Sequence, residues 1–133
     1  MQVDFAFLCD AAVAEGKLYA LGIGIDVIYA RQVPATHPSF TLVAQVRASV
    51  AEQGTKDMTV RLIDEDGADV APPVQAQITV GQPAPGMLES TARIIVGFNG
   101  VRFQKYGAYS MHLVIQGNEM ARLGLRVAPS PGS

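Results

Sequence analysis

The densest group of potential metal ligands is the acidic segment Asp64-Glu65-Asp66-Gly67, with Asp69 close behind it. Carboxylate oxygens on a loop are the ligands that Ca²⁺ prefers, so Asp64, Asp66 and Asp69 are the candidate metal residues. The segment lacks the distal glutamate that completes a calcium-binding loop. Asp-Gly between two apolar runs is also a strong signal for a hairpin turn. We therefore expect a turn here, with metal binding as the less favoured interpretation.

A serine, two histidines and the single cysteine could support nucleophilic or transition-metal chemistry. Ser110 and His112 share one face of a predicted strand, but strand neighbours at that spacing lie about 7 Å apart. That separation predicts no hydrogen bond between a nucleophile and its base. Cys9 shares strand parity with apolar neighbours and is expected to be a small buried side chain. His37 and His112 are expected at the surface, so we predict no catalytic residues and no transition-metal site.

Gly22-Ile23-Gly24 superficially resembles a phosphate-binding loop. It lacks a third glycine, a following helix and a Lys-Ser or Lys-Thr pair. We therefore predict no cofactor, and we interpret the two glycines as a β-bulge or a place where another backbone approaches closely.

These glycines belong to residues 18–30, LYALGIGIDVIYA, whose alternation predicts one long β-strand. The face expected to lie in the core comprises Tyr19, Leu21, Ile23, Ile25, Val27 and Tyr29. The opposite face is nearly bare, and another backbone could approach it closely. Its candidate interface residues are Leu18, Ala20, Gly22, Gly24 and Ile28. The alternative is that a loop or residues 2–9 of the same chain cover this face.

Strand signals dominate the rest of the chain, and no window of helical length repeats apolar residues at helical spacing. About eight short strands separated by turns predict an all-β fold. The expected architecture is an antiparallel β-sandwich with Greek-key connections, loosely immunoglobulin- or jelly-roll-like. We expect one domain over residues 1–127 and a flexible C-terminal tail over residues 128–133. Tyr106-Gly107-Ala108-Tyr109 is typical of a sandwich corner, where a tyrosine hydroxyl fixes a crossing loop.

The net charge of −2 and a pI of about 5.6 argue against nucleic acid as a partner. The charge is uneven, with five basic and eleven acidic residues in 1–89 but five basic and one acidic in 90–133. These halves either favour self-association or mix on one surface after folding. No apolar run approaches the about 20 residues of a membrane span. The start of the chain lacks the basic segment of a signal peptide. We expect a cytoplasmic protein with no membrane partner.

The chain resembles a family of short bacterial proteins of unknown function in the segments LCD, GKLYALGIGIDVIYA, VPATHPSFTLVAQVR, VRLIDEDG and FQKYGAYSMHLVIQG. The similarity covers most of residues 2–127. The shared positions are apolar strand residues, glycines and turns. The resemblance therefore implies an uncharacterised all-β domain and transfers no site residues.

Together these observations favour a non-enzymatic interaction or structural module that acts through its surface. We expect a protein partner, either a second copy in a homo-oligomer or a component of a larger assembly. The reason is that the first thirty residues are apolar on both strand faces. The alternative is a module that binds a small ligand, a carbohydrate or calcium, through the acidic turn or beside the loop of residues 81–89.

Overall fold

A computed structural model describes residues 1–131 and confirms the all-β prediction. These residues form ten strands where about eight were expected, because the long strand predicted up to Ala30 divides into two and residues 11–15 form a strand that was not predicted. The strands are β1 (Gln2–Cys9), β2 (Ala11–Glu15), β3 (Lys17–Leu21), β4 (Val27–Ala30), β5 (Ala35–Ser49), β6 (Gly54–Asp64), β7 (Val74–Val80), β8 (Glu89–Phe103), β9 (Gly107–Ile115) and β10 (Asn118–Pro129), with one 3-10 turn at Val50–Glu52.

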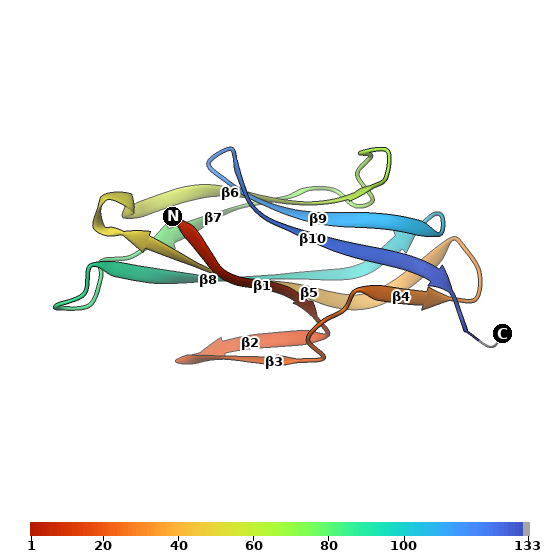
Figure 1. The fold of residues 1–133 in the computed structure, drawn as a ribbon, viewed down its shortest axis with the longest axis horizontal. Helices are drawn as coiled ribbons and strands as arrows, with labels where there is room; N and C mark the ends of the chain where they lie inside the picture. The colour runs from red at the N-terminus through yellow and green to blue at the C-terminus, as the bar shows by residue number, and fades with distance from the viewer. Residues whose placement is uncertain (132–133) are drawn as a thin grey trace.

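Two sheets face each other across the core. One has the strand order β4-β10-β9-β6-β7 and the other the order β1-β5-β8. Figure 1 shows them as two layers, with β9 and β10 above β5 and β8. The core between them contains a stacked pair, Phe40 and Phe98, with ring centroids 5.3 Å apart. Phe103 and Tyr109 pack edge to face at 5.0 Å. Along β9, Met111, Leu113 and Ile115 are buried while the residues between them are half-buried, as the alternation predicts.

The third sheet is the hairpin of β2 and β3, which lies on the outer side of the three-stranded sheet (Figure 1). Strand β2 contacts both β5 and β8. Gly16 forms the turn with a positive φ of 68°, a conformation that glycine adopts without steric cost. The hairpin covers an otherwise exposed apolar sheet face, where Cys9 and Val43 are fully buried outside the central core.

Residues 18–30 do not form the single strand that we predicted. Strand β3 ends at Leu21 and β4 begins at Val27. Gly22 and Gly24 interrupt the strand with φ values of 68° and 97°, which are incompatible with an extended chain. The backbone N–H of Gly24 then donates to the carbonyl of Leu8 at 2.9 Å. The glycines therefore mark the place where the chain leaves the hairpin and returns to the main sheets.

The predicted core face of residues 18–30 was also wrong for most of its members, although Ile25 packs against the core. Tyr19 is 55% exposed and Leu21 74% exposed, whereas Leu18 and Ala20 are half-buried. The hairpin therefore turns Leu18 and Ala20 toward the three-stranded sheet, and Tyr19 and Leu21 face outward. After the break, the chain enters a different layer of the fold. There, Ile28 is 7% exposed and belongs to the central core between the two main sheets.

Strand β4 pairs with β10 in parallel, from Val27 opposite Arg126 to Ala30 opposite Pro129. This pair departs from the wholly antiparallel arrangement that we expected. The chain reaches this sheet edge from the hairpin layer and leaves it for β5 in the other sheet, so no hairpin returns it alongside β10. Strand β10 includes Ala128 and Pro129, the first two residues of the predicted tail. The last two residues of that tail, 132–133, lie outside the described residues.

Two tyrosine hydroxyls tie the start of β9 to its surroundings, as the sequence of residues 106–109 predicts. Tyr109 donates to the carbonyl of Lys105 at 2.6 Å. Tyr106 donates to the carbonyl of Ala30 at 3.0 Å and so links this corner to the end of β4. Both hydroxyls satisfy backbone acceptors in partly buried positions, where an unpaired carbonyl would be costly.

Candidate functional site

The outer face of the five-stranded sheet carries a serine, a histidine and a carboxylate in hydrogen-bonding contact. Ser110 Oγ lies 2.7 Å from His112 Nε2. His112 Nδ1 contacts Glu119 Oε1, and the histidine side chain is 13% exposed. The expectation that Ser110 and His112 are too far apart for a hydrogen bond was therefore wrong. His112 lies on the strand face away from Met111 and Leu113, as predicted, although its side chain is largely covered there. The backbones are separated by one residue, but the imidazole reaches along the strand and closes the gap.

A β-bulge in β10 brings Glu119 and Arg122 onto the same face. The pairing with β9 is regular up to Glu119 opposite Val114, then shifts by one residue at Met120, so that Arg122 lies opposite His112. Residues three apart on a regular strand point to opposite faces, and the extra residue of a bulge removes that difference. Glu119 therefore reaches His112 from one side, while Arg122 lies beside it on the same face.

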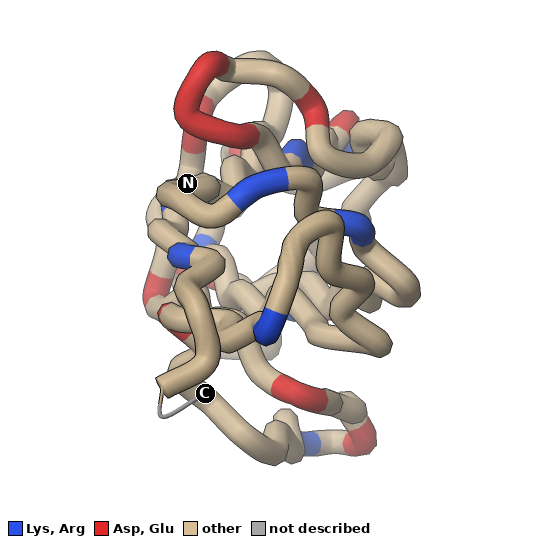
Figure 2. Tube along the Cα trace, turned by 90° about the vertical axis from the view of Figure 1, so that its right-hand side faces the viewer, with Lys and Arg blue, Asp and Glu red and all other residues tan. Residues whose placement is uncertain are grey.

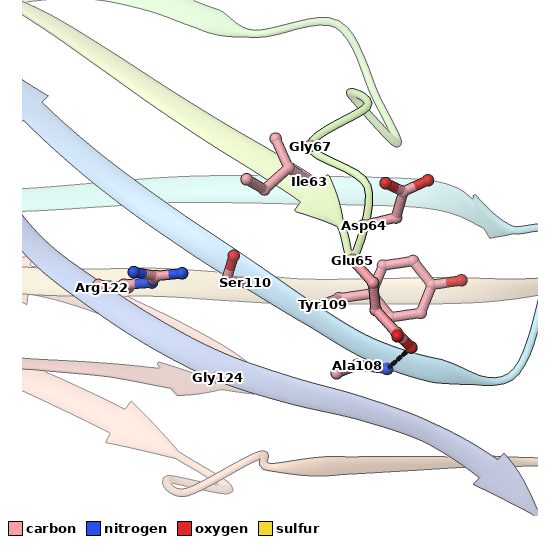
Figure 3. A pocket seen from close by; sticks show the side chains of 9 residues that line it. All are labelled: Ile63, Asp64, Glu65, Gly67, Ala108, Tyr109, Ser110, Arg122 and Gly124. Carbon is pink, nitrogen blue, oxygen red and sulfur yellow. Dashed lines mark hydrogen bonds between the residues drawn. The ribbon is translucent and has the colours of Figure 1, made fainter.

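Ser110 borders a hollow of about 490 Å³ in this face. Gly124 lies opposite Ser110 in the neighbouring strand, so no side chain fills the space beside the hydroxyl. Figure 3 shows Arg122 and Ser110 on one side of the hollow and Glu65 over Tyr109 on the other. Glu65 Oε1 accepts the backbone N–H of Ala108 at 2.8 Å, which holds the acidic turn against β9.

Arg122 differs from the other polar side chains of the hollow because its guanidinium makes no hydrogen bond or ion pair with any residue in 1–131. The adjacent Arg61, opposite His112 on the other side, pairs with Asp69 at 3.1 Å. The guanidinium of Arg122 therefore keeps its donors free beside the Ser110 hydroxyl, and it can accept an anionic group of a ligand.

The predicted metal candidates are each engaged elsewhere. Asp64 Oδ1 accepts the backbone N–H groups of Asp66 and Ala68 at 2.9 and 3.0 Å. The bond from Ala68, followed by that from Asp66, holds the pKa of Asp64 below its usual value. Asp66 pairs with Lys105 at 3.1 Å. Within residues 1–131 no group of three histidine, cysteine or carboxylate side chains is placed to hold a metal ion. The segment forms the turn that its Asp-Gly signal predicts.

The candidate interface residues do not share one surface. Ile28 lies in the core, Leu18 and Ala20 face the three-stranded sheet, and only the two glycines are exposed. The exposed large apolar side chains of this region are instead Val13, Tyr19, Leu21, Ile23 and Tyr29. Cys9 is buried, and this burial, with the nearby charge of Asp10, raises the pKa of its thiol.

Charges from the two halves of the sequence are interspersed over the fold. Figure 2 shows the acidic turn at residues 64–66 as a continuous red segment, with basic positions of other strands below it. The pair between Lys105 and Asp66 joins the basic and acidic halves directly. Folding therefore mixes the charges on one surface, which was one of the two outcomes that the sequence left open.

The chain belongs to a family of unknown function, DUF6941, whose model matches residues 4–128. This confirms the resemblance drawn from the sequence. No curated protein matches the chain. One similar solved structure is that of Pseudomonas fluorescens alkylpurine DNA glycosylase AlkC bound to DNA containing an abasic site analog. It is 11% identical with a TM-score of 0.42, and the match covers 76% of this chain but 27% of that chain.

We correct the exclusion of nucleic acid that we based on net charge, and one similar solved structure is that of a protein bound to DNA. A net charge of −2 describes the whole chain and excludes no local partner. The TM-score is too low to assign any role to this chain.

Among residues 1–131, no helix has the length and apolar character needed to cross a membrane.

Proposed function

We propose that this protein is a binding module for a small anionic ligand, held in the hollow beside Ser110. The observation that carries the proposal is the unpaired guanidinium of Arg122, which lines the same hollow as the Ser110 hydroxyl, where Gly124 leaves space open. Guanidinium groups bind carboxylate and phosphate oxygens with two parallel hydrogen bonds, and a neighbouring hydroxyl adds a further donor. Small-ligand binding was the alternative function expected from the sequence.

The surroundings of the hollow are consistent with a small ligand. Its volume of about 490 Å³ lies within the range of small-molecule sites. Strand β9, which carries Ser110, is paired on both sides, with β6 and with β10, and Arg122 lies in the part of β10 that pairs with β9. For the fold, we propose the finer description of a β-sandwich with Greek-key connections, supported by the two facing sheets. A cytoplasmic location stays a prediction from the sequence.

The test is an NMR titration of the full chain with inorganic phosphate and with acetate. We expect shift changes centred on Ser110, Arg122 and Gly124 that saturate with concentration. Arg122→Ala should abolish them. Arg102→Ala is the matched control, because it removes the same charge from an exposed position on β8 in the other sheet. The proposal is overturned if the two variants respond alike or if the wild-type shifts are spread over all basic residues.

A second candidate function rests on the hairpin of β2 and β3. Val13, Tyr19 and Leu21 are each more than half exposed on its outer face, and Ile23 extends the apolar surface beyond it. We propose that this surface is covered by another polypeptide, in keeping with the interaction module expected from the sequence. Tyr19→Asp would then abolish co-migration with that polypeptide in native mass spectrometry of cell-derived protein, whereas Thr79→Asp on β7 would not. Unchanged migration of both variants would refute it.

A further inference from the structure

We propose that Ser110 is an activated nucleophile and that the hollow hydrolyses a carboxylic ester. This inference rests on the proposed anion site, because the carboxylate product would be the anion that Arg122 binds. It departs from the sequence-based expectation of a non-enzymatic protein. That expectation relied on the separation of Ser110 and His112, which the structure contradicts.

The three side chains have the order needed to activate a hydroxyl. His112 Nε2 lies 2.7 Å from Ser110 Oγ, within the range for proton transfer. Its other nitrogen, Nδ1, contacts Glu119, which orients the ring and stabilises the imidazolium that forms when the serine proton is taken. The low exposure of His112 limits competition from water for both nitrogens.

The arrangement also indicates which group would stabilise the oxyanion. Strand β9 is hydrogen-bonded to β6 on one side and to β10 on the other, so its backbone N–H groups near Ser110 are used in the sheet. A side chain must therefore supply the donors. Arg122 is the unpaired cation lining the hollow, and its guanidinium can meet the carbonyl oxygen of an ester as negative charge develops there.

The reaction follows in two balanced steps. Ser110 Oγ attacks the ester carbonyl carbon as His112 Nε2 takes the hydroxyl proton. The bond from the acyl carbon to the alkoxy oxygen then breaks, and His112 gives the proton to the departing alcohol. In the second step, water attacks the acyl-serine, passing a proton to His112. The bond between Ser110 Oγ and the acyl carbon breaks, and the proton returns from His112 to Oγ. The carboxylic acid that forms keeps the second proton of the water, loses it to solvent, and leaves Arg122 as the carboxylate.

The experiment is labelling of the full chain with an alkyl fluorophosphonate, followed by peptide mass spectrometry. A bond forms between Ser110 Oγ and phosphorus, fluoride leaves and His112 takes the proton. We expect one label, on Ser110. Ser110→Ala should abolish it, and His112→Gln should slow it by about 100-fold, the usual contribution of a general base. Ser39→Ala and His37→Gln are the matched controls and should label at the wild-type rate.

Release of nitrophenolate from 4-nitrophenyl acetate provides the second readout. We expect Arg122→Ala to lower the rate by about 100-fold and Glu119→Gln to lower it with the fold intact. A label elsewhere, or an unchanged release rate in Ser110→Ala, would overturn the proposal. If phosphate binds at Arg122 but Ser110 takes no label, the hydrolase inference fails alone. If Ser110 takes the label but phosphate does not slow labelling, the anion-binding proposal fails alone.

Discussion

Ser110 Oγ and His112 Nε2 lie 2.7 Å apart although their residues are two positions apart on one strand of a sheet. Both side chains point outward from β9, while Met111 between them lies in the core. The serine hydroxyl is short and the histidine ring extends along the strand toward it. The spacing of residues along a strand therefore fixes the distance between their backbones, but it does not exclude a hydrogen bond between their side chains. The contact between Ser110 and His112 is the basis of the activity that we propose for the outer face.

Replacing Gly22 by alanine should destabilise the fold. Gly22 has a φ of 68°, and a Cβ there would overlap the carboxylate of Asp10. Left-handed backbone costs an L-residue roughly 1–2 kcal/mol, so we expect a loss of that size in the free energy of unfolding measured by urea denaturation. Gly81→Ala is the control, since Gly81 has no positive φ and no atom within 4 Å of the added Cβ. Equal stabilities of the two variants would contradict this account of the strand break.

The hairpin should protect the thiol of Cys9. Cys9 is fully buried, and burial raises the pKa of its thiol, so little reactive thiolate forms at neutral pH. We expect slow reaction with an aromatic disulfide reagent. Ala20→Asp places a charge beneath the hairpin and should speed the reaction, whereas Tyr19→Asp on the exposed side should not. If both variants react at the same rate, the hairpin is not what covers the thiol.

The acidic turn should make a pH-dependent contribution to stability. Hydrogen bonds from the backbone of Ala68 and Asp66 lower the pKa of Asp64 below its ordinary value of 3.8. A carboxyl whose pKa is lower in the folded than in the unfolded chain stabilises the fold above the unfolded value. That contribution is lost as the pH falls through the folded value. Wild type should therefore exceed Asp64→Asn in unfolding free energy at pH 7, with the difference shrinking below about pH 4.

Carbon-detected NMR of the Asp64 carboxyl gives the direct measurement. Its titration midpoint should lie below 3.8. A midpoint at or above that value, or a difference between wild type and Asp64→Asn that stays constant with pH, would show that the turn does not hold the carboxylate in this way.

Most of the core was predictable from alternation alone. Tyr109, Met111, Leu113 and Ile115 share one parity in the sequence and are all buried. The failure lies in residues 18–30, where the same parity argument assigned the core face incorrectly. Alternation identifies two faces but not which of them is covered, and here the smaller side chains face the sheet. The break itself depends on the positive φ values of two glycines, which an alternating pattern does not reveal.

The candidate site was partly accessible from the sequence. The turn Gln116-Gly117-Asn118 returns the chain antiparallel to β9 and so brings Glu119 near His112. The position of Arg122 was not accessible in this way, because it depends on the extra residue at Met120. Regular pairing would have placed Arg122 on the core side of β10, and bulges carry no clear sequence mark.

Gly124 offers the sharpest separation of function from folding. It lies opposite Ser110 with no positive φ and no atom within 4 Å of an added Cβ, so the backbone and the Cβ position both accept a side chain. Valine also favours strand conformation, and we expect unchanged or slightly increased thermal stability. Its side chain would occupy the hollow, so Gly124→Val should lose both the phosphate shifts and the labelling of Ser110.

Gly97→Val is the matched control for that variant. Gly97 is also an exposed strand glycine with open space around it, but it belongs to β8 in the opposite sheet. Gly97→Val should gain the same preference for strand conformation. It should still show the phosphate shifts and the labelling of Ser110. Retained binding and labelling in Gly124→Val would show that the ligand does not use the space beside Ser110. Loss of both in Gly97→Val as well would show that valine disturbs the protein generally, and the hollow would then have no special part in either activity.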